Sequence, residues 1–159
     1  MSLRDQIQTE LTAAMRSGDE LRRDTLRMVS SAAQYAEKNQ RRPLTDDEFL
    51  AVLAREVKTR RESVEAFRAG GREDLATKEE AEIRVLQEFL PAALTDDELL
   101  GLINEAIAAT GAASVRDMGK VMGWLAPRTR GRADGKHTSE LVARRLAATD
   151  LAAHSESAH

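Results

Sequence analysis

Helix-capping residues and helix breakers divide this sequence into segments in which apolar residues recur at helical spacing. Thr45 with Glu48 forms one capping pair, and Thr95 with Glu98 forms another. In such pairs, side-chain oxygens three residues apart satisfy backbone N–H groups at the start of a helix. No segment alternates apolar and polar residues for long enough to predict a strand. The chain is therefore predicted to be all-α.

Seven helices are expected from these signals. Each begins at a capping residue or after a breaker, and each but the last ends at a glycine or near a proline. The first four are long and rich in charge, whereas the last three are shorter. The expected helices cover about residues 3–17, 20–39, 46–69, 73–89, 96–110, 115–127 and 138–149.

The composition changes near Pro91, which predicts two parts within the 159 residues. An N-terminal four-helix subdomain is expected over residues 1–92, followed by a small three-helix tail subdomain over residues 93–150. Residues 151–159 are expected to be a frayed C-terminus. Ala and Leu dominate an apolar fraction of 42%, and aromatic residues reach only 3%, which favours helices over sheets.

The composition also excludes several classes of site. There is no cysteine, so disulfides, zinc–thiolate sites and thiol nucleophiles are ruled out. No run of about 18 apolar residues occurs, so no transmembrane helix and no membrane partner are expected. The N-terminal stretch MSLRDQIQTEL carries charge in every turn, unlike a signal peptide. A cytoplasmic location is therefore predicted.

Positive charge is concentrated near the C-terminal end of the chain. Between Arg116 and Arg145, eight Lys and Arg residues face three acidic residues, a net charge of +5 in a chain of net charge −3. Cations on a glycine-containing loop just before a helix N-terminus suit an oxyanion such as phosphate. The candidate tRNA- or phosphate-binding residues are Lys120, Arg128, Arg130, Gly131, Arg132, Gly135 and Lys136.

Structural explanations compete with binding in this region. The basic loop can be a solvated turn whose glycines supply only positive φ, and Asp134 before Gly135 is a turn signal that orders the loop. Gly119 and Gly123 are interpreted as permitting close helix packing. Trp124 could stack on an exposed base, but we favour a buried anchor for the small three-helix core.

A second basic cluster lies between Arg55 and Arg72, where six cations face three acidic residues. This cluster could extend an RNA-facing surface. The alternative, which we favour, is a solvated helix face with ion pairs four residues apart, such as Glu56 with Arg60.

Two stretches of this sequence resemble the GatB/YqeY family. They are GREDLATKEEAEIRVLQEFLP, from Gly71 to Pro91, and DMGKVMGWLAPRTRGRADGK, from Asp117 to Lys136. The family comprises small YqeY-like proteins, related to the C-terminal region of the GatB component of glutamine-dependent aminoacyl-tRNA amidotransferases. The resemblance extends over about residues 3–146 and implies an all-α protein with a three-helix tail.

The resemblance also implies an association with tRNA. In the amidotransferase the related tail helps to hold the tRNA body, and a YqeY-like domain is sometimes appended to a glutaminyl-tRNA synthetase. An aminoacyl-tRNA synthetase or an amidotransferase is therefore an expected protein partner. The family label, carbon–nitrogen ligase with glutamine as amido donor, belongs to the complete amidotransferase. Its glutaminase component and the kinase-like body of GatB are absent from these 159 residues.

Catalytic, metal and cofactor sites find little support in the sequence. His137 is the only histidine outside the C-terminal tail, and Ser139 lies on a different helix face. Glu79, Glu80 and Glu82 have no histidine beside them and fit a charged surface. The Gly71–Pro91 motif is interpreted as structural, and no cofactor or metal is expected.

Three functions remain open from the sequence. The leading hypothesis is a non-catalytic helical module that binds or positions tRNA. The alternative is a helical protein–protein interaction adaptor without nucleic-acid binding, suggested by the acidic net charge and the long charge-rich helices. Amide transfer by this chain alone is the third and least supported.

Overall fold

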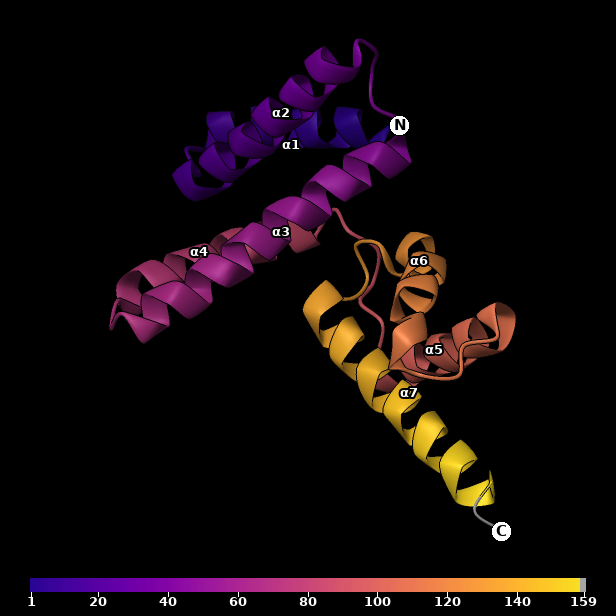
Figure 1. Cartoon of the computed structure of the whole chain (residues 1–159). Helices are drawn as coiled ribbons and strands as arrows, with labels where there is room; N and C mark the ends of the chain where they lie inside the picture. The colour runs from indigo at the N-terminus through magenta and orange to yellow at the C-terminus, as the bar shows by residue number, and fades with distance from the viewer. Residues whose placement is uncertain (158–159) are drawn as a thin grey trace. The chain divides into compact units, whose positions relative to one another are not determined.

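The computed structural model describes residues 1–157 and is all-α over this range, as predicted (Figure 1). The chain divides after Pro91 into two compact units, the second beginning at Ala92. The helices of the described residues are α1 (Leu3–Ser17), α2 (Glu20–Gln40), α3 (Asp46–Ala69), α4 (Glu73–Gln87), α5 (Asp96–Thr110), the 3-10 helix η1 (Val115–Asp117), α6 (Met118–Thr129) and α7 (Gly135–Ser157).

The helix boundaries follow the predicted caps. The Thr45 hydroxyl accepts the Glu48 N–H at 3.2 Å, and the Glu48 carboxylate accepts the Thr45 N–H at 3.2 Å. A reciprocal cap of the same kind between Ser114 and Asp117 opens η1. Gly18 ends α1 at φ +77°, in the left-handed region that favours glycine. These local signals fix where each helix starts and stops.

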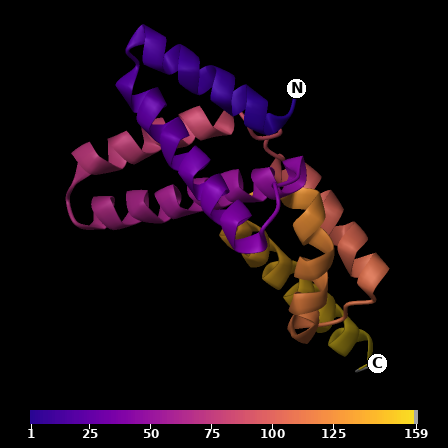
Figure 2. The ribbon, with the colours of Figure 1, turned by 90° about the horizontal axis from the view of Figure 1, so that it is seen from above.

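The first unit consists of two helical hairpins, α1–α2 and α3–α4. Figure 2 shows α3 and α4 side by side, with α2 crossing both. Leu26 of α2, Leu53 of α3 and Leu86 of α4 are fully buried in the shared core, and Ile7 of α1 joins them. Each such side chain contributes about 1.5–3 kcal/mol of hydrophobic stabilisation.

A buried arginine lies in the α3–α4 hairpin. Arg60 Nε donates to Glu82 Oε2 at 3.0 Å, and Arg60 Nη1 donates to Glu56 Oε2 at 2.8 Å. Burial disfavours the charged guanidinium, but these hydrogen bonds and charges outweigh it and raise the pKa of Arg60 above its ordinary value. The predicted Glu56–Arg60 pair is therefore confirmed, whereas the prediction of a solvated face is wrong at Arg60, which is 4% exposed.

The second unit is built from α5, η1, α6 and α7. Ile103 of α5, Leu125 of α6 and Leu146 of α7 are fully buried and form one core with their neighbours. Trp124 packs against this core while remaining half-buried. No helix in the described part of the chain is both long and apolar enough to cross a membrane.

The ends of α4 and α6 and both ends of α7 differ from prediction, and α4 ends at Gln87 rather than at residue 89. α6 continues through Pro127 to Thr129, because proline itself adopts a helical φ and the Gly123 carbonyl, which loses its N–H partner, belongs to an exposed residue. α7 begins at Gly135 and continues to Ser157, rather than covering residues 138–149. The predicted fraying of residues 151–159 concerns motion and stays a prediction, and residues 158 and 159 lie outside the described range.

Candidate functional site

The loop between α6 and α7 turns at a single glycine. Gly131 has φ +72°, a conformation that a side chain would strain. The Arg132 and Ala133 N–H groups both donate to the Thr129 carbonyl, at 2.8 and 3.1 Å, and close the turn. Gly135 is the first residue of α7 and is not among the glycines with positive φ. The expectation that both glycines serve the turn is thus correct only for Gly131.

Asp134 orders this loop, as predicted. Its Oδ2 accepts the His137 N–H at 3.2 Å, and its carbonyl accepts the Thr138 N–H at 2.9 Å and the Thr138 hydroxyl at 2.8 Å. A carboxylate of the chain itself therefore caps the start of α7. An oxyanion at that helix N-terminus would meet the Asp134 charge, so the cations of the loop, rather than the helix end, are the candidate binding groups.

Arg132 ties the loop to the beginning of the second unit. Its Nε donates to the Ala92 carbonyl at 3.2 Å, and its own carbonyl accepts the Leu94 N–H at 2.8 Å. These bonds fix the position of the half-buried Arg132 without neutralising its charge. The residue combines a structural role with a formal positive charge in the candidate site.

Arg128 folds back onto the only tryptophan of the chain. Its guanidinium carbon lies 3.6 Å from the centre of the Trp124 ring, and its Nη1 donates to the Trp124 carbonyl at 2.6 Å. The stacked cation interacts with the ring electrons. The prediction that Trp124 anchors the core is supported by its packing, but the ring is only half-buried and Arg128 covers one face.

The remaining cations of the predicted set are exposed. Arg130 and Lys136 form no side-chain hydrogen bond or ion pair within residues 1–155, whose side chains the structure describes, and Lys120 Nζ lies 3.9 Å from Asp117 Oδ1. Across this described range, Lys120 is the one member of the predicted set that is paired with a carboxylate. The structure thus places four cations within a nine-residue stretch, and no described carboxylate of residues 1–155 is paired with them: Arg128, Arg130, Arg132 and Lys136.

Gly119 and Gly123 do not serve helix packing. A Cβ atom at either position would meet no other atom within 4 Å, and both residues are exposed. The prediction of close helix packing is therefore wrong: the periodic pair reflects a shared exposed face of α6, not a packed one.

His137 and Ser139 are not hydrogen-bonded to each other in the described part of the chain. The His137 Nε2 lies 2.8 Å from Asp96 Oδ1, whereas the Ser139 hydroxyl donates to the Lys136 carbonyl at 3.0 Å. The serine and the histidine therefore bond to different partners. Over the residues that the structure describes, no group of three or more His, Cys, Asp or Glu side chains is placed to hold a metal ion.

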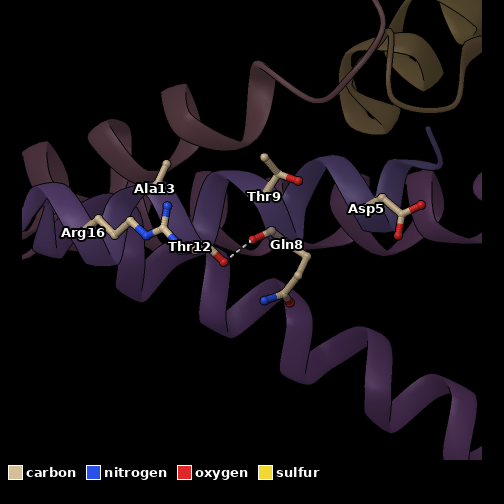
Figure 3. A pocket seen from close by; sticks show the side chains of 6 residues that line it. All are labelled: Asp5, Gln8, Thr9, Thr12, Ala13 and Arg16. Carbon is tan, nitrogen blue, oxygen red and sulfur yellow. Dashed lines mark hydrogen bonds between the residues drawn. The ribbon is translucent and has the colours of Figure 1, made fainter.

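A surface hollow of about 400 Å³ lies along α1 (Figure 3). Its one internal hydrogen bond drawn in the figure joins the Thr12 hydroxyl to the Gln8 carbonyl at 3.0 Å, a bond within a single helix. Each of its lining side chains is at least partly exposed to solvent. The hollow is lined by Asp5, Gln8, Thr9, Thr12, Ala13 and Arg16.

The fold and the site define an all-helical protein of two units with an exposed cationic loop in the second. A family model described as "Yqey-like protein" matches residues 4–146. Since this match covers most of the chain, the protein belongs to the Yqey-like family, in agreement with the resemblance seen in the sequence.

Fungal proteins are among its relatives. The chain is 30% identical over 139 residues to a Pyrenophora tritici-repentis protein named "Altered inheritance of mitochondria protein 41, mitochondrial", a match covering 86% of this chain and 76% of the relative. An uncharacterized Schizosaccharomyces pombe protein is 38% identical over 85 residues, covering 54% and 69% of the two chains. An Eremothecium gossypii protein with the same name as the first is 29% identical over 87 residues, covering 54% and 48%.

Proposed function

We propose that this protein is a non-catalytic helical module that binds or positions tRNA through the α6–α7 loop and the two helix ends that flank it. One observation carries the proposal: Arg128, Arg130, Arg132 and Lys136 lie on one short segment, and no carboxylate among the side chains described, those of residues 1–155, forms an ion pair with any of them. An uncompensated group of cations attracts a polyanion, and tRNA is the polyanion that the family resemblance implies.

Binding of this kind reads the phosphate backbone and shape of the RNA. The chain has few aromatic residues, at 3%, so stacking on several successive bases is not available. Phosphate contacts position a nucleic acid without reading its sequence. The module would therefore accept tRNA by its form, and a synthetase or amidotransferase partner would supply the choice of tRNA and any amide-transfer chemistry.

Titration of labelled total tRNA with the full chain at low salt tests this function. We expect binding at micromolar protein, and a strong loss of affinity in the triple variant Arg128→Ala, Arg130→Ala, Lys136→Ala. Each lost phosphate contact also lowers the salt dependence of log K by about 0.7–0.9. A triple variant in exposed cations of the first unit, Arg41→Ala, Arg55→Ala, Lys58→Ala, is the charge-matched control. No binding by the natural chain, or equal loss in both variants, contradicts the proposal.

A second candidate is a helical adaptor that binds another protein. The observation that favours it is an exposed apolar pair on α2, where Met28 is 52% exposed and Tyr35, two turns later, is 69% exposed. Recovery of a protein partner that survives nuclease treatment and is lost in Tyr35→Ala would support the adaptor. Recovery of RNA alone would support the first candidate.

We also propose a cytoplasmic location, where tRNA and its synthetases meet. Two of the relatives are named as mitochondrial proteins, which gives a direct alternative. Imaging of the protein with a C-terminal tag in its own cells decides between the cytoplasm and an organelle.

A further inference from the structure

We propose that Trp124 is a positioning residue, which holds the Arg128 guanidinium in place as a bidentate ligand for an RNA phosphate. This inference rests on the proposed function and adds to it one specified phosphate contact and the side chain that orients it.

Two contacts from the same residue fix the Arg128 guanidinium. The Trp124 ring lies beneath it, with 3.6 Å between the guanidinium carbon and the ring centre, and the Trp124 carbonyl accepts Nη1 at 2.6 Å. A free arginine side chain samples many rotamers and loses that freedom when it binds. Because Arg128 is already held, it loses less freedom on meeting a phosphate than an unsupported arginine does.

The stacked arrangement leaves the phosphate-binding edge of Arg128 open. Stacking uses the face of the planar guanidinium, whereas hydrogen bonds to an oxyanion lie in its plane. Nη1 is engaged by the Trp124 carbonyl, but Nε and Nη2 have no hydrogen-bond partner among the side chains and backbone of residues 1–155. Two parallel N–H groups on one edge match two phosphate oxygens. The contact with Trp124 and a contact with phosphate are therefore compatible.

The other cations of the loop lack this combination. Arg132 has no aromatic ring against it within residues 1–155, and its Nε donates to the Ala92 carbonyl, which leaves only the end-on edge formed by Nη1 and Nη2. Arg130 and Lys136 have no aromatic ring against them. Among these four cations, Arg128, near the end of α6, is accordingly the one that is held against an aromatic ring with its Nε–Nη2 edge open for a two-point contact.

The packing of Trp124 against the core lets its ring serve as a platform for Arg128. It is half-buried and packs against the core that contains Val121 and Leu125. The opposing interpretation is that the ring stacks directly on an RNA base after Arg128 moves away. The two interpretations differ in whether the effect of Trp124 depends on Arg128.

A double-mutant cycle on tRNA binding separates them, using the full chain with Trp124→Leu, Arg128→Ala and both together. We expect Trp124→Leu to weaken binding about three- to thirtyfold in the natural background, as befits a lost cation–π contact, and to have no effect when Arg128 is already alanine. Trp124→Phe should retain most of the tRNA affinity of the natural chain, because phenylalanine also offers an aromatic face. Arg128→Lys should weaken binding at unchanged charge, since lysine has no two-pronged edge.

Loss of tRNA binding has to be distinguished from loss of folding. Circular dichroism and thermal melting confirm that each variant is folded. If Trp124→Leu does not fold, the comparison of Arg128→Lys with Arg128→Ala decides alone, and equal affinity of Arg128→Lys and the natural chain overturns the inference. An equal effect of Trp124→Leu with and without Arg128 also overturns it, while tRNA binding stands. Absence of tRNA binding by the natural chain overturns the proposed function itself.

Discussion

Arg60 of α3 donates its Nε to Glu82 of α4 at 3.0 Å, in a pair whose side chains are 4% and 10% exposed. Because Arg60 is buried and paired in this way, it is not available to bind an anion at the second basic cluster. Arg68 of the same cluster is bound by Glu73 at 3.1 Å and by Glu80 at 2.5 Å. The cluster between Arg55 and Arg72 is thus largely an internal ion-pair system of the α3–α4 hairpin, and the first unit offers a weaker anion-binding surface than its charge count suggests.

Arg60→Met should destabilise the protein by about 3–5 kcal/mol, because it leaves the Glu82 carboxylate buried without its partner. Urea unfolding followed by circular dichroism measures this loss. The double variant Arg60→Met, Glu82→Leu should recover most of the stability, since an apolar pair has no buried charge to compensate. Arg55→Met, on the exposed side of α3, is the control and should change the midpoint little. Equal losses at Arg55 and Arg60 would contradict the buried-pair account.

Gly123→Ala should stabilise the protein by about 0.5–1 kcal/mol. The position lies inside α6, where glycine has more freedom to lose on folding than alanine, and a Cβ there meets open space. Gly131→Ala is the matched opposite: at φ +72° it should destabilise by about 1–2 kcal/mol. Thermal melting of the two variants compares them. A lower melting temperature for Gly123→Ala would indicate that this glycine does permit close helix packing.

Asp134→Asn separates helix capping from charge. Asparagine retains the side-chain oxygen that accepts the His137 N–H, so the cap at the start of α7 should be preserved. The variant removes a negative charge from the basic loop, so tRNA affinity at low salt should increase several-fold, by the ordinary Coulomb attraction of partly screened charges. Asp134→Ala should lose about 1 kcal/mol of stability through the missing cap. Weaker tRNA binding by Asp134→Asn would argue against a polyanion at this loop.

Sequence patterns determine the helices of this protein more surely than its charged contacts. The Thr45–Glu48 cap and the Gly18 stop depend on residues a few positions apart, so the sequence contains all the information that they need. Pro127 misled the prediction of a boundary because proline breaks a helix only through its missing N–H and its clash with the preceding turn. Near the end of α6, where the unpaired carbonyl belongs to the exposed Gly123, both are tolerated.

The contacts of the basic residues depend on distant parts of the chain and were not predictable in the same way. Arg132 bonds to Ala92, forty residues earlier, and Arg60 bonds to Glu82 on another helix. One signal was present for Arg60: it continues the apolar spacing of Leu53 and Val57 and so lies on the buried face of α3. The set of loop cations followed from sequence, but the stacking of Arg128 on Trp124 required coordinates.

The carboxylate of Glu48 should make the stability of the first unit depend on pH below neutrality. Hydrogen bonds from Arg42, at 2.7 Å, and from the Thr45 N–H, at 3.2 Å, lower the pKa of Glu48 to about 2. In the unfolded chain this carboxyl titrates near its ordinary value, about 4.3. Since the folded pKa is the lower one, the stabilisation is complete above the unfolded value and disappears as pH falls toward 2.

Glu48→Gln tests this dependence, because glutamine can replace glutamate in the capping pair but carries no charge. The melting temperature of the variant should lie below that of the natural chain at pH 7, and the gap should close as pH falls from about 5 to about 2. Asp47→Asn removes a neighbouring charge of the same helix turn without touching the Arg42 contact, and serves as the control. A gap for Glu48→Gln that stays constant over this range would mean that the Arg42–Glu48 contact does not lower the pKa in solution, so that Glu48 acts there only as an uncharged cap.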